Sequence, residues 1–239
     1  MELIIGIVSS VAAALLIFLG RWLWSKHLVL TYAVLRSGIV KVFQNADAAE
    51  EDIEKEALHS QVIKYLGVYN TTLLGRPVFN ETLLYRTLSK RSSDNYPEME
   101  FMHISADSLW AKSRADEIGF PMDTITEGLR KSESCLRQVV LHLRIPGEKV
   151  HLRHHDSVLR FRILMLSDIL YLNMYLPGRS MLGRQSPSFK IRRGAELFSV
   201  VEAYYNSIQE HASREHDFLK DEEARGAKKA EPTDSPDCL

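Results

Sequence analysis

The feature that most constrains this chain is an uncharged apolar run close to its first residue. The run covers residues 3–19 (LIIGIVSSVAAALLIFL), and apolar character resumes after Arg21 as Trp22-Leu23-Trp24. A helix rises 1.5 Å per residue, so roughly 20 residues cross the ~30 Å hydrocarbon core of a bilayer. The run reaches this length if Arg21 extends toward the headgroups, where Trp22 and Trp24 would also lie. We therefore expect residues 1–24 to form a transmembrane anchor that contacts lipid through residues 3–24.

The charges around this run predict its orientation. Only Glu2 and the α-amine precede it, whereas Arg21, Lys26, Arg36 and Lys41 follow it. Because positive charge favours the cytoplasmic side, we expect a single-pass protein with its N-terminus outside and its soluble domain in the cytoplasm. A cleaved signal peptide would need basic residues before the run and small residues after it. A buried core helix would rarely lack polar positions over such a length.

The remaining chain divides into three expected parts. Residues 25–37 read as a juxtamembrane linker or helix, and residues 38–215 as one α/β domain. Residues 216–239 form a charged tail: from Asp217 onward it has seven acidic and four basic residues and almost no apolar content, which predicts disorder. Overall, 45% of residues are hydrophobic and 26% charged, which suits a chain with a folded core.

Strand and helix patterns alternate along the domain. Short β-branched or apolar runs predict strands at residues 38–43, 62–69, 99–104, 150–154, 159–166, 169–176 and 189–192. Helical spacing and capping residues predict helices at 47–60, 77–90, 108–118, 121–143 and 195–214, with a polar turn at 70–72 and a loop at 91–97. Strands that first alternate with helices and then follow one another directly indicate an α/β fold with a mixed sheet.

Several common classes of site are not indicated. The sequence has no Gly-rich phosphate loop ending in GKS/T, no HExxH and no GxSxG. Two distant cysteines, Cys135 and Cys238, do not suggest a disulfide framework or a zinc site. The net charge of -1 gives no strong nucleic-acid signal. We expect neither a cofactor nor a metal.

The only cluster of histidines is His151, His154 and His155. On a strand, His151 and His155 would share one face and His154 the other. Two histidines on one exposed face without a carboxylate partner are a weak metal signal. Polar residues on the solvated face of an edge strand are the better interpretation.

Arginine is concentrated between residues 153 and 193, where few carboxylates occur. Arg160 and Arg162 would share one strand face, alternating with Leu159, Phe161 and Ile163. Guanidinium groups bind phosphate and other anions through paired hydrogen bonds. A phosphate or other anion site and scattered solvated arginines explain this pattern about equally well.

The order of the segments resembles the phospholipase D-like superfamily, in the divergent form found as a regulatory or sensor module in bacterial proteins. The resemblance covers roughly residues 36–215 and lies in pattern more than in one motif. Its segments are RSGIVKVF, VIKYLGVYNTTLL, SRADEIG (113–119), VHLRHHD, LRFRILMLSDILYLNMYLPG and FSVVEAYYNSI.

Catalytic members of that superfamily carry H-x-K-x4-D, with the histidine as nucleophile and the lysine on the phosphate oxygens. The matching strand here reads Arg160-Phe161-Arg162 and then Ser167-Asp168, and His103 is followed by Ile104 and Ser105. A guanidinium is never deprotonated in proteins, so it cannot be a nucleophile, although it can bind phosphate. The resemblance therefore implies the fold and argues against the activity.

These observations favour a membrane-anchored, non-catalytic sensing, regulatory or scaffolding domain. It would bind an anionic small molecule or a protein partner at a degenerate phosphodiesterase cleft lined by Arg160, Arg162, Asp168, Asn70 and Thr71. No catalytic residue is assigned. The first alternative is an active phosphodiesterase or phospholipase that uses a histidine from 151–155. The second is an assembly protein whose anchor self-associates through small residues in the run 6–13.

Overall fold

The computed structural model describes residues 36–76, 78–175, 186–212 and 214–216 of the chain. Its centre is one eight-stranded mixed sheet, in the order β1-β7-β6-β5-β2-β3-β4-β8. The expectation of an α/β domain with a mixed sheet is confirmed. The strands are β1 (Ile39–Phe43), β2 (Val62–Gly67), β3 (Glu98–Ile104), β4 (Val150–His155), β5 (Phe161–Leu166), β6 (Ile169–Met174), β7 (Ser188–Arg192) and β8 (Arg214–His216).

The middle of the sheet holds its parallel part. β2, β3 and β4 run parallel, and every other neighbouring pair is antiparallel. Parallel neighbours need long crossovers. The chain passes from β2 to β3 through α3 (Thr71–Leu74) and α4 (Leu83–Leu88), and from β3 to β4 through α5 (Leu109–Ile118) and α6 (Met122–Leu143). The carboxyl ends of these three strands therefore meet at one edge of the sheet.

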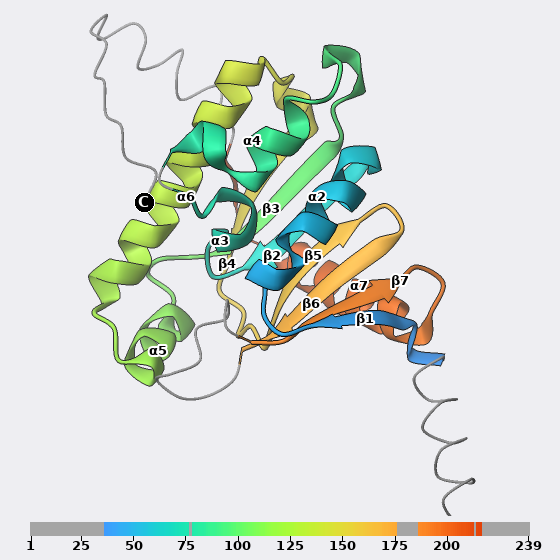
Figure 1. Ribbon diagram of the computed structural model, residues 1–239. Helices are drawn as coiled ribbons and strands as arrows, with labels where there is room; N and C mark the ends of the chain where they lie inside the picture. Colours follow the sequence, from blue (N-terminus) through green and yellow to red (C-terminus); the bar gives the residue numbers. More distant parts are fainter. Residues whose placement is uncertain (1–35, 77, 176–185, 213, 217–239) are drawn as a thin grey trace, which may run out of the picture.

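Helices cover both faces of the sheet, which explains why β2 and β3 are almost continuously buried. α2 (Glu50–His59), α4 and α6 lie on one face, and α7 (Glu196–His211) lies on the other (Figure 1). On the first face, Val139 of α6 belongs to the same buried cluster as Tyr65 and Phe101. On the second, Phe198 of α7 packs in a cluster with Ile163. Short 3-10 helices connect these elements: η1 (Asp47–Ala49), η2 (Phe79–Glu81), η3 (Ser93–Asn95) and η4 (Gly147–Lys149).

The helical segments differ from expectation in three places. The predicted helix 77–90 is interrupted at Thr82, whose extended backbone (ψ 149°) and side chain cap α4 by accepting a hydrogen bond from the Tyr85 N–H. The predicted turn at 70–72 instead begins the short helix α3. The predicted terminal helix stops at His211, and Arg214 lies in β8.

Within the described ranges, no helix has the length and apolar character needed to cross a bilayer. The predicted anchor at 1–24 lies outside the described residues. So do residues 25–35 and the tail from 217 onward.

Candidate functional site

The edge at which β2, β3 and β4 end collects most of the buried polar side chains of the domain. Register pairs His103 of β3 with His154 of β4, and Ile104 with His155. β5 runs antiparallel to β2, so its first residues, with Arg162, reach this same edge beside Gly67. Ligand sites in open α/β sheets gather at the carboxyl ends of strands. We therefore built the candidate site from this edge.

A carboxylate from α6 lies between two of the histidines. His103 and His154 lie two residues after the buried residues Phe101 and Leu152, so they share the face of the sheet that α6 covers. The Nε2 atom of His154 lies 2.7 Å from Oε1 of Glu133, in hydrogen-bond contact. The Nδ1 atom of His103 lies 3.9 Å from the same oxygen, too far for a hydrogen bond. The three side chains form a compact group that we call the His–Glu centre: His103, Glu133 and His154.

In this centre, burial and the neighbouring charges shift the pKa of each group in opposite directions. Burial of Glu133 alone would raise its pKa, but interactions with His103 and His154 lower it to about 2. Burial lowers the pKa of His103, and Glu133 opposes this only in part. At neutral pH the centre therefore combines a carboxylate with a neutral imidazole at His103.

His155 lies beside this centre and is fully buried, with 0% of its surface exposed. Neither of its ring nitrogens has a hydrogen-bond partner among the described residues. Burial, and then repulsion from His103, lower its pKa to about 4. The expectation that His151 and His155 share the solvated face of an edge strand is therefore wrong for His155, because β8 pairs with β4 and His155 is buried at the end of the strand.

Arg162 places a guanidinium at the same edge, with only 4% of the residue exposed. Its positive charge partly offsets the burial that raises the pKa of Tyr65. The Tyr65 ring stands edge-on to His103, with 6.1 Å between centroids, and its hydroxyl donates to the Tyr69 carbonyl at 2.9 Å. This ring occupies space that a side chain at Gly67 would need, since an added Cβ would lie 2.4 Å from the Tyr65 hydroxyl.

Asn70 extends the polar edge to α6. It is 1% exposed and caps α3 by accepting from the Leu73 N–H at 3.0 Å. Its own N–H donates to Oγ of Ser132, the neighbour of Glu133, at 3.1 Å. The Nδ2 atom of Asn70 makes no hydrogen bond within the described part of the chain. Thr71 is the first residue of α3.

Two of the five sequence-predicted site residues lie elsewhere. Arg160 precedes β5 and is exposed; its charge acts on Tyr204 of α7, on the opposite face of the sheet. Asp168 follows β5 at the far edge, where its carbonyl accepts from the Arg193 N–H at 2.7 Å. β5 is six residues long, so at ~3.3 Å per residue about 20 Å separates its two ends. Asp168 cannot share a site with Arg162.

The sequence interpretation missed His103 and Glu133 as site residues. His103 lies at the end of one predicted strand, and Asn70 directly follows another. This shared position at strand ends could have identified His103 as a candidate site residue. Glu133 stands next to Ser132 in the buried stripe of α6 that also contains Leu129 and Leu136. Two adjacent polar residues within the apolar stripe of a helix were the sequence signal that could have identified Glu133. No group of three or more His, Cys, Asp or Glu with metal-binding potential occurs in the described ranges.

No protein-family model and no curated protein matches this sequence. Two solved structures are distant matches. One is TrmBL2, an archaeal chromatin protein with a novel mode of DNA binding, at 10% identity and a TM-score of 0.42, covering 81% of this chain and 62% of that one. The other is phosphatidylserine synthase of Haemophilus influenzae Rd KW20, at 14% identity and a TM-score of 0.45, covering 75% and 40%. This chain spans less than two thirds of either protein, and likeness at these scores assigns it no substrate or partner.

Proposed function

We propose that this protein is a membrane-anchored, non-catalytic sensing or regulatory module that binds an anionic ligand at the edge built from Arg162, Asn70 and the His–Glu centre. The observation that supports this most is a set of buried polar atoms that make no close hydrogen bond to the described residues: the ring nitrogens of His103 and His155, and Nδ2 of Asn70. Glu133 still acts on His103, at 3.9 Å. Buried polar groups without partners are rare in folded proteins, and they concentrate where a ligand or an ion binds.

The charge of the edge favours an anion. Arg162 provides a planar, permanently charged donor, and the Asn70 amide adds a neutral donor at the same edge. Glu133 is the one carboxylate in the set, and contact with His154 already occupies it. A phosphate or carboxylate ligand suits this arrangement.

The non-catalytic assignment rests on the positions that correspond to the phospholipase D-like motif. Arg160 stands where the resemblance requires the nucleophilic histidine, and Arg162 where it requires the phosphate-binding lysine. Arg160 cannot act as a nucleophile, whereas Arg162 keeps a positive charge that can bind phosphate. We therefore propose a phospholipase D-like fold that retains recognition without turnover.

Membrane attachment is the second part of the proposal. The run at 3–19, continued through Trp24 with Arg21 extended toward the headgroups, has the length and composition of a transmembrane helix, and the basic residues after it favour a cytoplasmic domain. Replacing Arg21 with Glu removes the nearest positive charge and should disturb insertion or orientation. Reporter fusions to either end would reveal this, and an unchanged orientation would contradict the topology.

Ligand binding is tested by comparing two arginines of the same segment. In Arg162→Gln, we expect inorganic phosphate to bind about tenfold more weakly, because one charge-assisted hydrogen bond is worth roughly 1.5 kcal/mol. In the matched variant Arg160→Gln, affinity should change less than twofold, since that side chain is exposed on the other face. The measurement is titration calorimetry on the full chain in nonionic detergent, with mass spectrometry of co-purifying small anions. Equal affinities in both variants would contradict the site.

A second candidate function is favoured by the His–Glu centre. A neutral imidazole at His103, next to an ionised Glu133, has the protonation state of a general base. Such a base would take a proton from water as the water oxygen bonds to phosphorus and the bond to the leaving oxygen breaks, and the imidazolium formed would give that proton to the leaving oxygen. Hydrolysis of bis(p-nitrophenyl) phosphate by the full chain, lost in both His103→Ala and His154→Ala, would replace the non-catalytic proposal.

A further inference from the structure

A second buried arginine, Arg114 of α5, lies at the same edge of the sheet as Arg162. Helix α5 starts at Leu109, shortly after β3 ends at Ile104, so it lies next to the carboxyl ends of the parallel strands. Arg114 is only 4% exposed, as Arg162 is, and the other buried residues of α5 are alanines. Arginine is rarely buried to this degree in folded proteins, which makes Arg114 a candidate for a function at this edge.

Tyr175, which follows β6, connects α5 with the ends of the strands. The Arg114 guanidinium lies over the Tyr175 ring, 5.3 Å from its centroid. Trp110, one turn earlier in α5, makes a T-shaped contact with the same ring, with 6.1 Å between centroids. The Tyr175 hydroxyl accepts a hydrogen bond at 3.1 Å from the N–H of Val68, the residue that follows β2. The ring therefore spans the space between α5 and the end of β2.

The charge of Arg162 acts on the same hydroxyl. Arg162 lies beside Gly67, the residue that precedes Val68. Burial raises the pKa of Tyr175, whereas the charge of Arg162, the hydrogen bond from Val68 and the charge of Arg114 lower it. One phenol hydroxyl is thus within electrostatic range of two permanently charged groups, one from β5 and one from α5. It marks the region in which both positive charges act.

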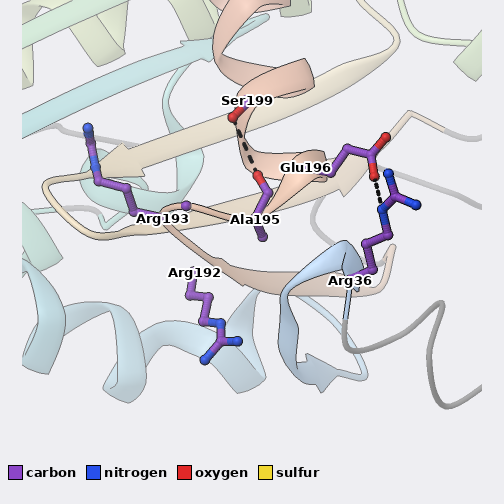
Figure 2. Close-up of a pocket in the computed structure, with 7 residues that line it drawn as sticks. Arg36, Arg192, Arg193, Ala195, Glu196 and Ser199 are labelled. Carbon is purple, nitrogen blue, oxygen red and sulfur yellow. Dashed lines mark hydrogen bonds and ion pairs between the residues drawn. The ribbon is translucent and has the colours of Figure 1, made fainter.

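Arginines at the far edge of the sheet are arranged differently. A pocket of about 660 Å³ lies there between the chain before β1, the end of β7 and the start of α7, and its lining includes Arg36, Arg192 and Arg193. Figure 2 shows that the Arg192 and Arg193 side chains point in different directions, and that Arg36 pairs with Glu196, at 2.7 Å. These cations do not gather around one point, whereas the two buried arginines share one phenol.

We propose that Arg114 is a second ligand-binding residue of the anion site, and that the ligand presents a phosphate group that bridges Arg162 and Arg114. This inference rests on the function proposed above and names the chemistry of its ligand. A tetrahedral phosphate has several charged oxygens that two guanidiniums can approach from different directions. The two oxygens of a carboxylate lie in one plane and suit a single guanidinium. The second arginine therefore selects phosphate over carboxylate.

Glu117 competes with this phosphate for Arg114. Its Oε2 atom lies 2.6 Å from Nη1 of Arg114, and its side chain is 38% exposed. An ion pair that reaches solvent is weak, so an incoming phosphate can replace the carboxylate or share the guanidinium with it. Removing this carboxylate should therefore strengthen phosphate binding without changing a buried residue.

The test compares two neighbouring acids of α5. In Glu117→Gln, we expect inorganic phosphate to bind the full chain in nonionic detergent about threefold more tightly, because the competing carboxylate is gone. Asp116→Asn removes the same charge from the adjacent exposed position, so it should bind phosphate as wild type does. In Arg114→Gln, phosphate should bind about tenfold more weakly, as in Arg162→Gln. Titration calorimetry measures all four affinities.

The outcomes separate this inference from the proposed function. Equal affinities in Glu117→Gln, Asp116→Asn and wild type would overturn the role of Arg114 even if Arg114→Gln failed to fold, because both acids lie on the surface of α5. A loss of affinity in Arg162→Gln alone would keep the anion site and refute the second arginine. Acetate should compete with phosphate at least about tenfold less well, since it cannot bridge both arginines. Equal competition would refute the phosphate assignment.

Discussion

Replacing Lys190 with Met is expected to lower the free energy of unfolding by about 3 kcal/mol, the lower end of the cost of breaking a buried ion pair. The Lys190 side chain is 12% exposed, and its Nζ lies 2.6 Å from Oδ2 of Asp52 and 2.7 Å from Oε1 of Glu56. The same Asp52 oxygen accepts from the Tyr171 hydroxyl at 2.5 Å. Met keeps the apolar stem of the side chain but leaves two carboxylates of α2 next to each other without their shared cation. The expected loss of free energy of unfolding stays at the lower end of that range because the Glu56 side chain is partly exposed to solvent.

Lys41 offers a matched control at the same carboxylate. Its Nζ lies 3.4 Å from Oδ1 of Asp52, but its side chain is 55% exposed. Lys41→Met should therefore cost less than about 1 kcal/mol, as exposed ion pairs do. Urea unfolding of the full chain in detergent, followed by circular dichroism, measures both variants. Equal losses would show that burial of Lys190 does not set the strength of this contact.

The strands were largely predictable because their runs of apolar and β-branched residues are bounded by clear turn residues. The run Val62–Gly67 is a central strand covered on both faces, and such strands read as nearly continuous apolar segments. Helix α6 was predictable from its amphipathic spacing and from the proline and glycine that follow it. These features depend only on residues close in sequence.

The errors have two causes: a side-chain cap that divides one helical pattern, and a strand that forms by pairing with a segment far away in the sequence. The pattern of Phe79, Leu83 and Leu88 fits one helix, yet the hydroxyl of Thr82 both caps α4 and donates to the Phe79 carbonyl, which divides the segment. β8 exists because its backbone pairs with β4, about 60 residues earlier in the chain. Local propensity carries no information about such a partner.

The candidate site was only partly predictable because strand direction decides which residues meet. Arg162 and Asn70 lie at one edge because both stand at the appropriate ends of their strands, and their role in binding stays a prediction. Asp168 was included because Ser167-Asp168 stands near the aspartate position of the H-x-K-x4-D motif, but an extended strand carries it to the opposite edge. His103 was set aside because Ile104 and Ser105 follow it, so it does not complete an H-x-K motif, whereas α6 brings Glu133 to His103 and His154 only in the folded chain.

The buried histidines predict a loss of stability in mild acid. Burial lowers the folded-state pKa of His155 to about 4, below its value of about 6.5 in an unfolded chain. The unfolded chain therefore binds more protons between these two values, so stability must fall as the pH drops through this window. From pH 7.5 to pH 5 the expected loss from His155 alone is about 2 kcal/mol. The lowered pKa of His103 adds to it in the same direction.

The other shifted group of this site, Glu133, changes the stability over a lower pH range, so the contribution of His155 can be measured separately. Glu133, with its pKa lowered to about 2, stabilises the fold above its unfolded value and loses this contribution only below about pH 4.5. His155→Leu removes two buried nitrogens that lack partners, so it should cost little at pH 7.5 and remove about 2 kcal/mol of the acid loss. His59→Gln, an exposed position at the end of α2, should keep the full loss. The measurement is the urea midpoint of wild type, His155→Leu and His59→Gln at pH 7.5 and pH 5. If His155→Leu lost as much stability as wild type, the buried imidazole at the end of β4 would not be the group that weakens this fold in acid.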